Sequence, residues 1–114
     1  MSGSVSVTTG QPLSPWIKTR GASLVKHVLY NEDVTSTAHM IFEAAEELDV
    51  NGNPVHSEIV EKDADVACGP GQQKTYTLRN CPYPFMRLSA SGDPPGYAST
   101  LVRGGIEVLS GDAR

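Results

Sequence analysis

The amino-acid sequence predicts an all-β fold, an antiparallel β-sandwich of the jelly-roll or immunoglobulin-like type with about seven or eight strands. The first observation is a period of two, because short runs alternate apolar and polar residues, most clearly over residues 22–30 and 97–102. Such alternation places one side-chain set in a core and the other in water. The second is that Gly, Pro, Asn and Asp separate the runs, as tight connections require. The third is the length of 114 residues, which suits one domain with one modest core.

The chain is expected to divide into three parts. Residues 1–15 are rich in Ser, Thr, Gly and Pro and are expected to form an extended N-terminal arm. This arm would pair with a sheet edge or reach a neighbouring subunit. Residues 16–110 form the sandwich domain, and residues 111–114 form a short polar tail. The candidate assembly residues of the arm, where Val alternates with Ser and Thr, are Ser4, Val5, Ser6, Val7, Thr8 and Thr9.

The first half of the domain is expected to contain three strands. Residues 16–19 form a short strand, and residues 22–30 form the strongest strand, which is central. Residues 34–43 form the next strand, because the Val-Thr-Ser-Thr segment is β-prone. A helix competes over residues 38–48, where several apolar residues fit a 3.6-residue stripe, and a helical turn over residues 44–48 is the alternative.

The second half begins with a strong turn over residues 49–54, which contains an Asn-Gly pair typical of hairpins. The final strand is expected to carry a bulge at Gly104 and Gly105. The expected strands are residues 56–61, 65–68, 73–78, 85–90 and 97–109. Candidate contact residues lie in the 49–54 turn and in the loop over 91–96; they are Asn51, Gly52, Asn53, Asp93, Pro94 and Pro95.

Composition argues against two classes of partner. The net charge is −4 and the nine basic residues are dispersed, so no basic stripe for nucleic acid is present. The longest apolar run has only a few residues, far below the roughly 20 that span a bilayer, so no membrane partner is expected. The N-terminus has neither the basic nor the apolar region of a secretory signal, so we expect synthesis in the cytoplasm.

No catalytic, metal or cofactor motif is found. The histidines His27, His39 and His56 have no metal-ligand spacing, and we expect them to lie on the surface or half-buried on strands. His27 and His39 lie on neighbouring predicted strands and could approach each other, but two imidazoles would still need a third ligand. The Asp and Asn residues of the 49–54 turn lack calcium-loop spacing. We therefore predict a protein that is not an enzyme and has no cofactor.

The cysteines and the aromatic residues each leave two interpretations. Cys68 and Cys81 are expected to be reduced and mostly buried after cytoplasmic synthesis. The alternative is a disulfide, which would contribute about 3 kcal/mol if its geometry were relaxed. Trp16, Tyr83 and Tyr97 would form a sugar-stacking platform if they lay together. The preferred interpretation places Trp16 and Phe85 in the core and leaves the tyrosine hydroxyls in water.

Three segments carry a resemblance to a known class of protein. They are residues 16–21 leading into the strand over 22–30, the Tyr-Pro-Phe-Met-Arg-Leu segment at 83–88 ahead of the Ser-Ala-Ser-Gly loop, and the long final strand. In this order of elements the chain resembles small β-sandwich modules of tailed-bacteriophage particles, which include capsid decoration (cement) proteins and tail or baseplate modules. The resemblance implies a particle protein without catalysis and identifies no binding residues.

The function that we expect is that of a non-enzymatic virion structural protein, a capsid decoration protein that binds and stabilises a bacteriophage head lattice. Its partners would be the major capsid protein lattice and sister subunits in a homotrimer. It would be synthesised in the host bacterial cytoplasm and would lie on the capsid exterior. One alternative is a carbohydrate-binding or host-adhesion module of a tail fibre, with a glycan as partner. Another is a component of the tail or of the head–tail connector.

Overall fold

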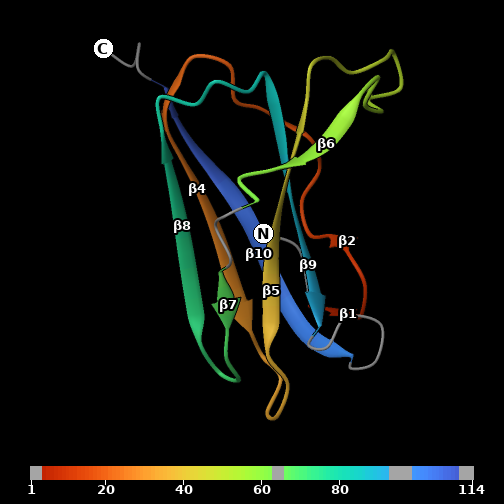
Figure 1. Cartoon of the computed structure of the whole chain (residues 1–114), viewed down its shortest axis with the longest axis vertical. Helices are drawn as coiled ribbons and strands as arrows, with labels where there is room; N and C mark the ends of the chain where they lie inside the picture. The colour runs from red at the N-terminus through yellow and green to blue at the C-terminus, as the bar shows by residue number, and fades with distance from the viewer. Residues whose placement is uncertain (1–3, 63–65, 93–98, 111–114) are drawn as a thin grey trace.

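The computed structural model of the chain describes residues 4–62, 66–92 and 99–110, and this part of the chain contains no helix. Ten strands form two antiparallel sheets (Figure 1), which confirms the expected all-β sandwich. Sheet A contains, in spatial order, β1 (Val5–Val7), β10 (Thr100–Ser110), β4 (Ala22–Asn31) and β8 (Gln73–Arg79). Sheet B contains β2 (Gln11–Pro12), β9 (Phe85–Gly92), β5 (Ala38–Ala45) and β6 (Ser57–Val60), with β3 (Ile17–Lys18) paired to β9 and β7 (Ala67–Cys68) paired to β5. The number of strands exceeds the expected seven or eight because the N-terminal segment adds two short strands, β1 and β2, to those expected after residue 15.

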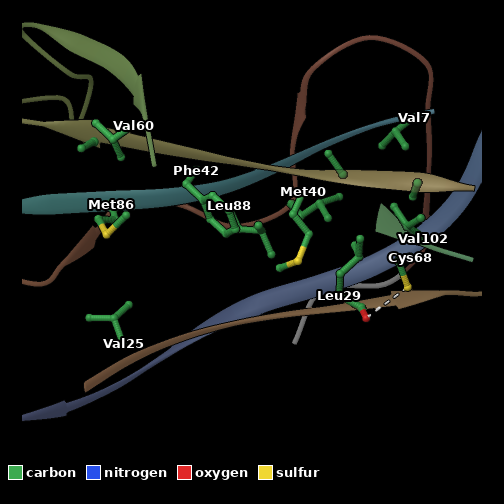
Figure 2. Close-up of a cluster of buried hydrophobic side chains, with 14 of the residues drawn as sticks. Val7, Val25, Leu29, Met40, Phe42, Val60, Cys68, Met86, Leu88 and Val102 are labelled. Atoms are coloured by element: carbon green, nitrogen blue, oxygen red, sulfur yellow. Dashed lines mark hydrogen bonds between the residues drawn. The ribbon is translucent and has the colours of Figure 1, made fainter. Parts of the chain in front are cut away.

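Alternating side chains of the two sheets fill the core. Val25 and Leu29 of β4 have no exposed surface, and they face Phe42 of β5 and Met86 and Leu88 of β9 (Figure 2). Each such side chain, when fully buried, stabilises the fold by about 1.5–3 kcal/mol. The two-residue period of the sequence is therefore the direct cause of the two-layer architecture.

The N-terminal segment joins both sheets. β1 pairs with β10 of sheet A, and β2 pairs with β9 of sheet B. Val7 and Leu13 are buried in the common core, and the Leu13 N–H donates to the Leu88 carbonyl oxygen at 2.8 Å. The Thr8 carbonyl oxygen accepts the N–H of Gly92 at 3.1 Å. Of the two placements expected for the arm, the structure therefore shows pairing with the edges of its own sheets.

β10 and β4 form the longest pairing of the sandwich. The register shift lies between Leu109 and Ser110, so the bulge predicted at Gly104 and Gly105 is wrong. Both glycines keep a regular register with β4. A Cβ on Gly104 would lie 2.5 Å from the Val28 carbonyl oxygen, whereas a Cβ on Gly105 would meet nothing within 4 Å. Gly104 is therefore required because two strands approach each other closely there. A glycine within a strand is typical both of such a close approach and of a bulge, so the sequence does not distinguish them.

β5 begins and ends later than predicted. Residues 34–37 form a bent loop and not the start of a strand, because the Asp33 carboxylate accepts backbone N–H groups there. β5 then continues through Ala44 and Ala45, which pair with β9. The alternative of a helical turn over residues 44–48 is therefore wrong, and the good helix formers of this segment are overruled by sheet pairing.

Two further boundaries differ from the predictions. β9 continues to Gly92, which pairs with Ala38 of β5, so the loop predicted over 91–96 does not include its first two residues. The rest of that loop, and the first two residues of the predicted strand over 97–109, lie outside the described residues.

Candidate functional site

The residues predicted from the sequence to make contacts lie at opposite ends of the sandwich. β1, within the predicted arm, lies at the same end of sheet A as the last residue of β4, because Val5 pairs with Val102 of β10 and Val102 pairs with Asn31. The turn from Asn51 to Asn53 follows β5 at the other end of the molecule (Figure 1). The structure therefore gives two separate candidate contact regions. Asp93, Pro94 and Pro95 lie outside the described residues.

The first contact region is the hairpin between β5 and β6, whose turn is fixed by Asp49. The Asp49 carboxylate accepts the N–H groups of Asn51 and Asn53, both at 2.9 Å. Gly52 supplies the left-handed conformation of the turn, with a φ of 83°. Turn chemistry thus accounts for these polar residues, as the sequence predicted. Val50 at the tip is 101% exposed.

The second contact region is the loop between β4 and β5, which is fixed in the same way by Asp33. Its carboxylate accepts the N–H groups of Thr35, Ser36 and Leu101 at 3.1, 2.9 and 3.3 Å. The N–H donors of Ser36, Thr35 and Leu101 lower the pKa of Asp33 to about 2. Val34 in this turn is 87% exposed. Each end of the sandwich therefore presents an exposed valine on a carboxylate-fixed turn.

The sequence predicts a turn that ends at Asp33, whereas the turn continues over residues 34–37, and the signal for this continuation is present in the sequence. An Asp followed by Thr and Ser two and three residues later can accept their backbone N–H groups and close a local turn. The β-propensity of the Val-Thr-Ser-Thr segment predicts a strand, but the Asp33 carboxylate before it accepts the backbone N–H groups of Thr35 and Ser36 and holds a loop instead. The bond to Leu101 spans 68 residues and could not be foreseen from local pattern.

A shallow cleft lies beside the first hairpin and encloses about 180 Å³. Its residues come from the end of β5, the start of β6 and the link after β8. They are Ala44, Ala45, Glu46, His56, Ser57, Glu58, Tyr83 and Pro84. The half-buried Tyr83 has its pKa raised by burial and by the nearby Glu61 carboxylate. An aromatic ring beside carboxylates and an imidazole suits a small polar ligand with one apolar face.

No local sequence pattern predicts this cleft. Glu46 and His56 are separated by the whole hairpin, and they meet only because Leu48 bridges to Pro54 and the Val55 N–H donates to the Glu47 carbonyl oxygen. The spacing of these residues along the chain therefore does not predict that they line one cleft.

The alternative of a sugar-stacking platform is not formed among the described residues. The Arg87 guanidinium covers the Trp16 ring at 4.7 Å and makes two hydrogen bonds to the Glu43 carboxylate at 3.1 and 3.0 Å. These groups lie on the outer face of sheet B, because Arg87 and Glu43 are paired and alternate with core residues. Tyr83 instead packs against the core, and Tyr97 lies outside the described residues.

The prediction that Trp16 and Phe85 fill the core is also wrong. Both are only half-buried, and the ring inside the core belongs to Phe42. Phe85 pairs with Ala45 on the outer face of sheet B. The strand that contains Phe85 was predicted correctly, but the side of this strand that faces the core was not.

His27 is fully buried, contrary to the prediction of a surface or half-buried position. It faces the core from sheet A, with ring centroids 4.8 Å from Phe42 and 6.5 Å from Tyr76. Neither of its nitrogens has a hydrogen-bond partner among the described residues. Burial lowers its pKa to about 4. His39 belongs to the other sheet and alternates with the buried Met40, so the two histidines do not approach each other.

The candidate disulfide is not formed, because Cys68 and Cys81 are both free and buried. Cys68 pairs with Ala38 at one end of β5. Cys81 contacts Met86, which pairs with Ala44 near the other end of β5. Six residues of strand separate these positions, about 20 Å at a rise of roughly 3.3 Å per residue. This exceeds the Cα separation that a disulfide spans, and the preferred prediction of two buried thiols is confirmed.

Within residues 4–62, 66–92 and 99–110, no three His, Cys, Asp or Glu side chains are placed to hold a metal ion together. That part of the chain also has no helix that is both long and apolar enough to cross a bilayer. No protein-family model, curated protein or solved structure matches this chain. The features of the described residues that bear on function are therefore the sandwich, its two fixed turns and the cleft.

Proposed function

We propose that this chain is a non-enzymatic structural protein of a virus particle, a capsid decoration protein that binds the outer surface of a bacteriophage head lattice and stabilises it. The observation that carries the proposal is the pair of carboxylate-fixed turns, one at each end of the sandwich. They hold Val50 and Val34 almost fully in solvent.

Fixed turns favour binding because they are ordered before contact. A loop that is already held by two or three hydrogen bonds loses little conformational entropy when a partner covers it. A lattice repeats the same contact many times, so a modest affinity of each copy still braces the shell. β1, which is held by three residue pairs, is the shortest strand of sheet A and supplies a further candidate contact with sister subunits.

The direct test is co-sedimentation of the purified protein with heads of the virus that carries this gene, after removal of the resident copies. The native chain is expected to sediment with the heads. The Val50→Asp variant is expected to bind at least tenfold more weakly, because a charge would be buried at the contact. Its thermal melting should match that of the native chain, since Val50 contacts solvent only.

The matched control is Val55→Asp, at a partly exposed valine of the same hairpin that lies away from the tip. This variant should bind as the native chain does. If neither the native chain nor any variant sediments with the heads, the decoration function is wrong.

The cleft supports one alternative, a glycan-binding module of a tail fibre. Its ring and carboxylates match the chemistry of a sugar, whose hydroxyls need hydrogen-bond acceptors and whose C–H face packs on an aromatic ring. A glycan array probed with the native chain and with Glu46→Gln tests it. Binding to one glycan class that the variant loses supports the alternative, and an array without binding removes it. A third proposal, a connector or tail component, differs from the first only in its position on the particle.

A further inference from the structure

We propose that the free edge of β8 is a self-complementary surface that pairs with β8 of a second copy of this chain, joining two sheets A into one continuous sheet across a two-fold axis. This inference concerns self-association, does not depend on the capsid proposal, and gives a pair of chains where the sequence suggested a trimer. β8 is the terminal strand of sheet A and lies at its outer border (Figure 1). Among the described strands none pairs with its far side.

The direction of the backbone groups of β8 follows from two hydrogen bonds at its ends. The Asn31 N–H donates to the Gln72 carbonyl oxygen, and the Asn80 N–H donates to the Ser23 carbonyl oxygen. Both bonds place the even-numbered residues of β8 in hydrogen-bonded pairs with β4, because such pairs alternate along an antiparallel ladder. The odd-numbered residues therefore point their N–H and C=O groups away from β4. They are Gln73, Thr75, Thr77 and Arg79.

One register lets two copies of β8 use all of these groups. If two strands run antiparallel about Tyr76, Thr75 of one copy lies opposite Thr77 of the other, and Gln73 lies opposite Arg79. Both pairs join odd-numbered residues, so each is a hydrogen-bonded pair. All seven residues of the strand overlap, which gives about eight backbone hydrogen bonds between the copies.

The side chains of the same register are compatible. Lys74 lies opposite Leu78 and Arg79 lies opposite Gln73, so no like charges face each other. Thr75 and Thr77 are exposed on the outer face and form the Thr–Thr pair that favours antiparallel strands. The outward backbone groups and the side-chain pairs of β8 therefore both match those of an identical strand, which points to a second copy as the occupant of this edge.

The other sheet edges are less suited to the same role. β1 has three residues, β2 and β3 have two each, and the opposite edge of sheet B is divided between the short β6 and β7. Short and interrupted edges are the usual means by which proteins avoid edge pairing. β8 has seven consecutive residues available for pairing. Its only charged residues are Lys74 and Arg79.

The test is sedimentation velocity of the full chain over a concentration series. The native chain is expected to move from monomer towards dimer as its concentration rises. Thr75→Pro is expected to stay monomeric, because it removes an outward N–H and no bond to β4. Its matched control, Thr75→Ser, keeps that N–H and should associate as the native chain does.

A charge exchange tests the register even if the proline variant folds poorly. The double variant Thr75→Lys/Thr77→Lys and the double variant Thr75→Glu/Thr77→Glu should each be monomeric, since like charges would then lie opposite each other. An equal mixture of the two should form a heterodimer. A native chain that stays monomeric at every soluble concentration would overturn the proposal. So would a dimer that persists in Thr75→Pro, or two folded charge variants that do not associate with each other.

Discussion

His27 is the single residue that most clearly determines a property of the protein, the pH dependence of its stability. Its ring has no exposed surface and no hydrogen-bond partner among the described residues. Burial therefore lowers its pKa from 6.5 to about 4. The neutral imidazole is compatible with contacts to Phe42 and Tyr76, whereas the imidazolium would be a buried charge without a partner.

This burial predicts a loss of stability in mild acid. Above pH 6.5 neither the folded nor the unfolded chain protonates His27, so its contribution does not change with pH. As the pH falls from 6.5 towards about 4, the unfolded chain takes up a proton that the folded chain does not, and the free energy of unfolding falls by about 3 kcal/mol. Urea unfolding of the native chain and of His27→Leu at a series of pH values measures this difference.

The His27→Leu variant should lose this part of the pH dependence, and it should be more stable than the native chain by about 1 kcal/mol at neutral pH. Asp33 does not contribute to the change in stability between pH 6.5 and about 4. Its pKa is lowered from 3.8 to about 2, so its stabilising contribution is lost only as the pH falls through that lower range. Equal pH profiles for the native chain and the variant would show that His27 is not the group concerned.

At the scale of the element, the pairing of β10 with β4 shows where sequence patterns are ambiguous. The two adjacent glycines suggested a bulge, but only one of them is required by the structure. A Cβ on Gly104 would lie 2.5 Å from the Val28 carbonyl oxygen and within 3.3 Å of side-chain atoms of Leu88 and Leu13. The reason is a contact between strands that are far apart in the chain, and no local pattern reports it.

The two glycines give a matched pair of variants. Gly104→Ala is expected to lower the free energy of unfolding by about 2 kcal/mol, because the backbone of β4 must move to admit the methyl group. Gly105→Ala is expected to raise it by about 0.5 kcal/mol, because its site is open and Ala costs less entropy than Gly in a strand. Chemical unfolding of both variants measures the two signs, and a larger loss for Gly105→Ala would contradict the assigned register.

Other elements show the same division between local and tertiary information. The strand over 22–31 and the Asp49 turn followed from alternation and turn chemistry, since both signals are local. The strand over 38–45 begins later than predicted because the Asp33 side chain fixes the loop before it. Its last residues also fit a helical period, but they form a strand because they pair with β9. The cleft was not predictable, because its residues meet only through the register of a hairpin.

At the scale of the whole molecule, the fold class was the most predictable property. A period of two repeated along a chain of this length leaves few arrangements other than two packed sheets. The face that each strand turns inward was less predictable, as Trp16, Phe85 and His27 show. Function is the least determined by sequence, because the proposed contacts lie on two fixed turns and one edge strand that carry no chemical motif.

We propose that this sandwich is a structural part of a virus head. Cryo-electron microscopy of particles from the virus that carries this gene, with and without the gene, tests it most directly. We predict additional density on the outer capsid surface at regular lattice positions, of the size of this sandwich and touching the lattice through a fixed turn. Identical heads in both preparations, or density confined to the tail, would contradict the claim.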